Sequence, residues 1–317
     1  MCIRDRFYTY IIRSENEIDI RQILFSGQTF LWEINHFNHE YYSSIINGVS
    51  IFIRQISTQE FEVNTIENEI KGMPIPLFFQ RYFSLDIDMD RVFPESFARF
   101  YPDLWKLLAE YFSLRIMRQD PFETMISFMC AQGIGMHLIR KQVSMLIKTY
   151  GEKTTVTFAG NEIELYNFPD PERLAAADPF MLSRCTNNNR VRANNIIAVS
   201  QGVVEGKVDF QRLCDRDMPL SEVRRKLSEN RGIGFKIADC IALFGLGRFD
   251  AFPIDTHVKQ YLGSWFKSTT ALRSLSPASY LILDAEARSF LNPDFAGYAG
   301  HILFHCWRRE IKKLQSF

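Results

Sequence analysis

Two ionisable side chains, Lys236 and Asp255, stand at positions where they could meet and do chemistry. The lysine follows the glycine turn Gly232-Ile233-Gly234 at the start of an apolar stretch, and the acid lies 19 residues further on. An amine attacks as a nucleophile only when it is neutral, and partial burial lowers its pKa. A nearby carboxylate can stabilise developing positive charge and handle protons. One predicted helix and one turn separate the two groups, so the chain is long enough to bring them together.

A helix, a tight turn and a second helix are predicted around these residues. Residues 221–227 have a charged amphipathic pattern and residues 235–244 an apolar one, and both are typical of helices. Gly232 and Gly234 can take backbone angles that other residues avoid, so the chain reverses in few residues. Backbone N–H groups at such a turn and at a helix N-terminus bind phosphate. Four basic residues add positive charge nearby: Arg224, Arg225, Lys226 and Arg231. The arrangement predicts a sequence-independent grip on a nucleic-acid backbone.

Composition limits the class of protein. The chain has 317 residues, of which 46% are hydrophobic and 23% charged, as expected of a globular protein with a sizeable core. The net charge is zero, so binding to nucleic acid needs a local basic surface. The six cysteines are scattered without C-x-x-C spacing, which argues against a disulfide framework.

The sequence also suggests where the protein works. No apolar run reaches membrane-spanning length, and the first ten residues lack signal-peptide character. We therefore expect an intracellular monomer without a membrane partner, cytoplasmic at the nucleoid if the source is bacterial. The first six residues, MCIRDR, do not resemble the rest of the chain, and we assign them no function.

The pattern of hydrophobic residues changes near residue 100. Residues from about 7 to 100 have strand character, and Asn47-Gly48 between two apolar runs is a strong hairpin signal. From Pro102 the apolar residues repeat at helical spacing. We predict an α+β fold with an antiparallel sheet domain over 1–100 and an all-helical domain over 101–317.

The stretch 227–258 resembles the helix-hairpin-helix DNA glycosylases that carry a Gly/Pro-rich loop and a catalytic aspartate (the HhH-GPD superfamily). It matches L-x(4)-G-[IV]-G-x-K-x-A-D-C followed by P-[IV]-D-x-H, which points to the 8-oxoguanine DNA glycosylase branch. The resemblance places the helix-hairpin-helix at about 221–245 and the Gly/Pro-Asp loop at 246–258. Further matches are Ser26-Gly27-Gln28-Thr29-Phe30-x-Trp32, the Y-F-x-L-D motif at 82–86 and Arg118-Gln119-Asp120-Pro121. In all, the resemblance runs from about residue 20 to 310.

The resemblance implies a role for each candidate residue. Lys236 attacks the sugar C1′, expels the base and forms a Schiff base, while Asp255 assists. In the base pocket, the Gly27 carbonyl accepts from the N7–H of oxidised guanine, and Cys240 and Phe304 face the extruded base. The DNA-binding residues are Gly232, Ile233, Gly234, His257, Arg192 and Gln132, of which His257 contacts a phosphate and Arg192 the orphaned base. No cofactor and no metal are implied, because the four-cysteine spacing of the iron–sulfur variant is absent and His257 has no partners at ligand spacing.

The chain departs from the branch at several positions that contact DNA in the family. An asparagine cluster is replaced by Gly133-Ile134-Gly135, and Leu138 stands where the branch has an arginine. Val191 replaces an aromatic wedge, and Gly300 replaces a glutamine that reads the base edge, although His301 follows it. Because of these departures, the identity of the damaged base and the preference for the opposite base stay open.

Each candidate also has an ordinary structural interpretation. Lys236 would only touch phosphate or solvent, Gly27 would be a turn glycine, Gln132 a helix-end amide, Arg192 a surface charge, Cys240 a small buried side chain and Phe304 a core residue.

The function we predict is base excision of 8-oxoguanine from duplex DNA, with lyase activity at the abasic site. Two alternatives stay open: a glycosylase for alkylated or other modified bases, and a non-catalytic protein that binds damaged DNA. The joint presence of Lys236 and Asp255 argues against the pure binder, which needs neither.

Overall fold

The computed structural model describes residues 7–130 and 132–314, so the segment MCIRDR lies outside it. The chain divides into two compact units that alternate along the sequence: Met1–Asp86 with Cys130–Lys207, and Ile87–Met129 with Val208–Phe317. We had predicted a single domain boundary near residue 100, whereas these two units alternate along the sequence. The division into domains at 1–100 and 101–317 stays a prediction. Within the described residues, no helix combines the length and the apolar character that crossing a bilayer requires.

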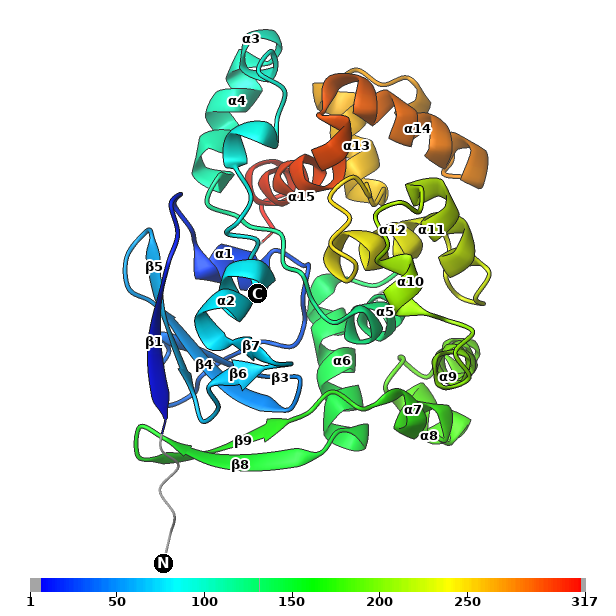
Figure 1. The fold of residues 1–317 in the computed structure, drawn as a ribbon. Coiled ribbons are helices and arrows are strands. Elements are labelled where there is room, and N and C mark those ends of the chain that lie inside the picture. The colour runs from blue at the N-terminus through cyan, green and yellow to red at the C-terminus, as the bar shows by residue number, and fades with distance from the viewer. Residues whose placement is uncertain (1–6, 131, 315–317) are drawn as a thin grey trace, which may run out of the picture. The chain divides into compact units, whose positions relative to one another are not determined.

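A five-stranded antiparallel sheet in the order β1-β5-β4-β3-β2 is the framework of the first unit (Figure 1). Its strands are β1 (Tyr8–Arg13), β2 (Glu33–Ile34), β3 (Tyr41–Ile46), β4 (Val49–Gln55) and β5 (Glu60–Thr65). Asn47 and Gly48 join β3 to β4 with φ angles of 48° and 82°, as a two-residue hairpin turn requires. The predicted hairpin and antiparallel sheet are confirmed.

Strand character ends earlier than we predicted. After β6 (Glu69–Ile70) and β7 (Met73–Pro74) the chain forms α2 (Ile75–Tyr82), and later α3 (Phe97–Phe100). The buried residues of α2 are Ile75, Phe79 and Tyr82. Their spacing of four and three residues is helical, and a proline in the first turn suits a helix start.

The rest of the first unit is mainly helical. Its helices are α1 (Ile20–Phe25), α6 (Met136–Tyr150), α7 (Pro171–Ala175), α8 (Pro179–Arg184) and α9 (Arg190–Val204). One hairpin interrupts them, formed by β8 (Lys153–Phe158) and β9 (Asn161–Tyr166). The Phe158 ring stacks on Phe52 of β4 with centroids 4.0 Å apart. The part predicted to be all helical thus contains a hairpin that packs on the main sheet. The predicted fold class, an antiparallel sheet followed by mostly helical structure, is confirmed.

The described residues of the second unit form helices and connecting loops, without a strand. Besides α3, its α-helices are α4 (Pro102–Leu108), α5 (Pro121–Cys130), α10 (Phe210–Leu213), α11 (Leu220–Ser228), α12 (Phe235–Phe244), α13 (Thr256–Trp265), α14 (Pro277–Phe290) and α15 (Ala296–Cys306), and a π-helix follows at Trp307–Ile311. Eight successive residues of α12, Ile237–Phe244, are buried, as are nearly all of α15. These two helices form the centre of this unit, and α12 carries Lys236.

Candidate active site

The glycine turn places Lys236 at the start of α12. Gly232 has a φ of +87°, which favours glycine, and Gly234 is the N-cap of the helix. The half-buried Lys236 holds its Nζ 5.2 Å from the centroid of the Phe128 ring. One helical turn later, Cys240 is buried, and burial raises the pKa of its thiol to about 11, an effect that Lys236 opposes. The amine therefore lies against aromatic and apolar surface.

Asp255 is the N-cap of α13. Its Oδ1 accepts from the Val258 N–H at 2.9 Å, and the positive end of the helix dipole favours a carboxylate there. The predicted capping role of Asp255 is confirmed. Both Asp255 and Lys236 influence the pKa of the Cys240 thiol, in opposite directions. The acid and the amine thus both lie within electrostatic range of the Cys240 thiol.

A row of aromatic rings connects the helices that carry these two groups. His257 of α13 contacts Phe304 edge-on at 5.9 Å, and Phe304 stacks on His301 at 5.6 Å. His301 meets Phe244 at 5.1 Å, and Phe244 stacks on Phe128 at 5.5 Å. Since Phe128 is the ring beneath the Lys236 amine, the row forms a continuous wall. Phe304 is only half-buried, so part of this wall is accessible.

The wall is largely uncharged at neutral pH. Burial lowers the pKa of His301 to about 3 and also lowers the pKa of His257, so both imidazoles are neutral at pH 7. The guanidinium of Arg308 lies 5.5 Å from the Phe304 centroid, and Asp255 opposes the lowering of its pKa by burial. A planar, electron-poor ligand suits such a surface of rings.

Gly300, where the family has a glutamine, has no room for a side chain. A Cβ there would lie 2.2 Å and 2.5 Å from two ring atoms of Phe252, whose side chain is 1% exposed. The neighbouring His301 points into the aromatic row, where it stacks on Phe304. Position 300 therefore presents no polar side chain to the wall, whereas the neighbouring His301 contributes its imidazole ring.

Gly27 lies in the first unit, in the turn that follows α1. Its φ is +96°, and a Cβ would meet the Met136 side chain at 2.0 Å. Gln28 is buried and donates from Nε2 to the Ile23 carbonyl at 2.9 Å. The motif is thus a buried, glycine-requiring turn, and the base contact of Gly27 stays a prediction.

The Arg192 side chain of α9 donates hydrogen bonds to backbone carbonyls within the first unit. Its guanidinium donates to the carbonyls of Cys130 at 3.3 Å and Gln132 at 2.7 Å. Val191 beside it is 70% exposed. The structure gives Arg192 a structural role at the end of α5, and its contact with an orphaned base stays a prediction, as does that of Gln132.

Two of the four basic residues that we expected to form a positive surface beside the hairpin do not contribute to one. The Arg224 side chain is 6% exposed and binds Asp239, so it is not available to a phosphate. Arg225 forms ion pairs with Glu222 and Glu229. Four basic residues in sequence suggested a basic surface, but burial and local acids offset two of them.

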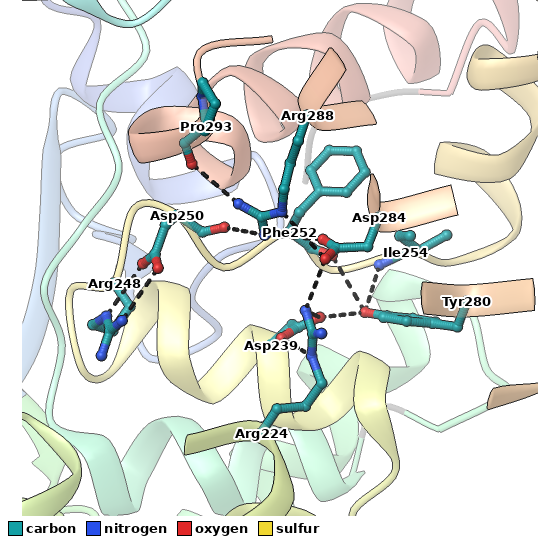
Figure 2. Close-up of polar contacts among 10 residues, drawn as sticks. All are labelled: Arg224, Asp239, Arg248, Asp250, Phe252, Ile254, Tyr280, Asp284, Arg288 and Pro293. Carbon is teal, nitrogen blue, oxygen red and sulfur yellow. Dashed lines mark hydrogen bonds and ion pairs between the residues drawn. The ribbon is translucent and has the colours of Figure 1, made fainter. Parts of the chain in front are cut away.

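A buried ionic network begins at Asp239, on the adjacent face of α12 about one turn after Lys236, and Figure 2 shows this network. Asp239, with no exposed surface, accepts from Arg224 at 2.9 and 3.0 Å and from the Tyr280 hydroxyl at 2.6 Å. Asp284 pairs with both Arg224 and Arg288. Arg288 also donates to the carbonyl of Asp250 at 2.7 Å, in the loop before Asp255.

Sequence reasoning missed this network. The available signal was Asp239, an acid inside an apolar helix, since a buried carboxylate requires partners. Nothing in the spacing identifies Tyr280, which lies 41 residues away.

Within the described parts of the chain, no cluster of three or more His, Cys, Asp or Glu side chains could hold a metal ion. The structure brings Lys236, Asp255, Cys240, Phe304 and His257 together in the second unit. Their chemical roles stay predictions.

Comparisons with known proteins agree with this geometry. The model of the 8-oxoguanine DNA glycosylase N-terminal domain matches residues 10–125. The chain is 25% identical to the N-glycosylase/DNA lyase of Saccharomyces cerevisiae over 78% of this chain and 68% of the relative. It is 24% identical to the N-glycosylase/DNA lyase OGG1 of Arabidopsis thaliana over 88% and 74%. The solved structure of MBOgg1 in complex with a low-affinity DNA ligand has the same fold, with a TM-score of 0.77, 24% identity and coverage of 96% and 99%.

Proposed function

Because the chain belongs to the 8-oxoguanine DNA glycosylases of the helix-hairpin-helix superfamily, we propose that it excises oxidised guanine from duplex DNA and then cleaves the strand. The observation that carries this proposal is that Lys236 and Asp255 both act electrostatically on Cys240 and come from helices joined by one aromatic wall. A nucleophilic amine, a carboxylate and a slot for a flipped base are the groups that this chemistry needs.

The reaction we propose proceeds through a covalent intermediate. The neutral Lys236 amine attacks C1′ as the bond from C1′ to the base nitrogen breaks, and the base leaves with the electron pair and takes up a proton. Asp255 stabilises the positive charge that develops on the sugar. The C1′–O4′ bond of the sugar ring then breaks, which leaves a hydroxyl at C4′ and a Schiff base between the amine nitrogen and C1′. Loss of a C2′ proton follows, and the C3′–O bond breaks to release the 3′ phosphate.

The DNA partner we propose is a duplex with one damaged base, bound by a monomer inside the cell. The backbone N–H groups at the α12 N-terminus bind a phosphate. The Ile233 N–H of the preceding turn instead donates to the Asn230 carbonyl at 3.1 Å. Because phosphate contacts release counterions, we expect the binding constant to fall as salt rises. A filter-binding series at several salt concentrations measures this.

Borohydride trapping tests the chemistry. A duplex with a single 8-oxoguanine opposite cytosine is incubated with the wild type and with Lys236→Gln, and the reduced covalent complex is measured. We expect a complex with the wild type only, and retained DNA binding by the variant. Base release at the same rate from both proteins contradicts the nucleophile assignment.

Gly300 favours one alternative, a glycosylase for alkylated bases. An aromatic wall in which position 300 carries no polar side chain suits a cationic base, which leaves readily. This alternative predicts that Asp255→Asn abolishes base release from alkylated DNA while Lys236→Gln retains it. The same two variants therefore separate the functions.

A further inference from the structure

We propose that Tyr280 is a positioning residue, whose buried hydroxyl holds the segment carrying Asp255 against the helix carrying Lys236. The inference rests on the proposed function for its chemical consequence, whereas the contacts belong to the structure. Figure 2 shows Tyr280 reaching from α14 toward Asp239 and Ile254.

The hydroxyl makes two complementary hydrogen bonds. It accepts from the Ile254 N–H at 3.1 Å and donates to Asp239 Oδ2 at 2.6 Å. The Phe252 carbonyl lies 3.3 Å away, a longer contact with the same oxygen. A tyrosine hydroxyl carries one hydrogen, so the short bond to Asp239 takes it and the oxygen remains free to accept from Ile254.

These two bonds join the elements that bear the reacting groups. Asp239 lies three residues after Lys236 on α12, and Ile254 directly precedes Asp255. The covalent path between Lys236 and Asp255 runs through 19 residues, including a loop with Gly247 at a φ of +63°. The Tyr280 hydroxyl spans the same gap with two hydrogen bonds.

The other contacts of the network make this bridge rigid. Arg224 holds Asp239 through two bonds and reaches Asp284 at 3.5 Å. Asp284 lies one turn beyond Tyr280 on α14, so the helix that presents the hydroxyl is tied to the same arginine. A fully satisfied buried polar network has one low-energy arrangement. Small misplacements of reacting groups lower rates strongly, so fixing this arrangement serves the reaction.

Tyr280→Phe removes only the hydroxyl and tests the proposal. We expect the single-turnover rate of base release, and of borohydride trapping on a preformed abasic site, to fall roughly tenfold. The dissociation constant for lesion DNA should change less than about twofold, because the hydroxyl does not reach the surface. The matched control is Tyr111→Phe, which removes another buried hydroxyl of the second unit, bonded to Glu310. The control should keep the wild-type rate.

A double variant separates positioning from a general loss of structure. If Tyr280 acts through Asp255, Tyr280→Phe should change the residual rate of Asp255→Asn by less than about twofold. If Tyr280→Phe lowers the rate of Asp255→Asn by a further roughly tenfold, the two residues act independently and the proposal is wrong. A wild-type rate in Tyr280→Phe alone also contradicts it.

Amide hydrogen exchange of the peptide that covers 252–255 tests the contact without any reaction. Pro253 has no amide, so Ile254 dominates the protection of this peptide. We expect slow exchange in the wild type and faster exchange in Tyr280→Phe. Fast exchange in the wild type overturns the proposal even if the variant does not fold. If the wild type exchanges slowly but releases no base from any lesion, the proposed function fails while the contact stands.

Discussion

Two adjacent faces of α12 have different roles, one reactive and one structural. On one face, Lys236 lies over the Phe128 ring and beside the Cys240 thiol. On the other, Asp239 binds a bidentate arginine and a tyrosine hydroxyl. The first face has aromatic surface and few polar contacts, and the second has a complete set of them.

The difference shows how stability and reactivity are separated. A buried charge without partners is costly, so Asp239 requires Arg224 and Tyr280. A nucleophilic amine loses reactivity when strong acceptors hold it protonated, so an apolar neighbourhood suits Lys236. Changes on the two faces should therefore have different effects, and variants of each face can be ranked from the largest expected effect to the smallest.

Changing the reactive face should remove chemistry and leave stability. We expect Lys236→Gln to lower base release by roughly 10³-fold or more, because the nucleophile is lost. The free energy of unfolding should change by less than about 0.5 kcal/mol, since the lysine is only half-buried. Single-turnover kinetics and urea unfolding measure the two quantities. A large loss of stability in this variant would erase the contrast between the faces.

Changing the ionic face should remove stability first. Arg224→Met leaves the Asp239 carboxylate buried without its main partner, and we expect a loss of about 3–5 kcal/mol in the free energy of unfolding. Replacing both residues, as Arg224→Met with Asp239→Leu, should recover most of that loss. The neighbouring Arg225→Met, on the exposed surface, serves as control and should unfold at the wild-type denaturant concentration. Equal losses in the two single arginine variants contradict the burial argument.

Two buried histidines of α15 should make the free energy of unfolding depend on pH. Burial lowers the pKa of His301 to about 3 and that of His305 to about 4, whereas both titrate near about 6.5 in the unfolded chain. Between these values the unfolded state binds more protons, so stability is complete above about pH 6.5 and falls as the pH drops, by about 1.4 kcal/mol per pH unit for each histidine. Urea unfolding at pH 7, 6 and 5 measures the slope, which His305→Phe should reduce by half. An unchanged slope in that variant assigns the titration to other groups.

The smallest effect should come from packing at the back of the wall. Gly300→Ala forces a methyl group against the Phe252 ring, and we expect a loss of about 1–3 kcal/mol despite the better helix propensity of alanine. Phe252→Leu in the same chain should relieve the clash, so that the double variant is more stable than Gly300→Ala. Thermal unfolding of these variants shows whether the close approach of Gly300 to the Phe252 ring limits the size of the residue at position 300.

Local signals explain what the sequence predicted well. The glycine turn, the helices on either side, the Asp255 cap and the Asn47-Gly48 hairpin depend on residues that are neighbours in the chain. The β8–β9 hairpin was missed although its signals are local. Strand-like alternation ends at Ala159 and Gly160, which have φ angles of 51° and 83°.

Long-range pairing explains what the sequence did not predict. Arg224 belongs to a basic run that is typical of a surface, and only the packing of α11 against α12 shows that Asp239 binds it. Tyr280 comes from a third helix and has no pattern that identifies it. The aromatic row likewise depends on four helices meeting, which spacing within one helix cannot show.

The close fit of Gly300 beneath Phe252 also restricts the mutational routes open to this protein. Introducing a glutamine at 300 in one step would place its Cβ 2.2 Å from the ring of Phe252, which is almost fully buried. Shrinking the ring first would leave a cavity, which is itself destabilising. The two positions are therefore epistatic, and a variant library that changes position 300 alone should strongly favour glycine. A library that varies 252 and 300 together is the one in which a polar base reader at this turn can be selected.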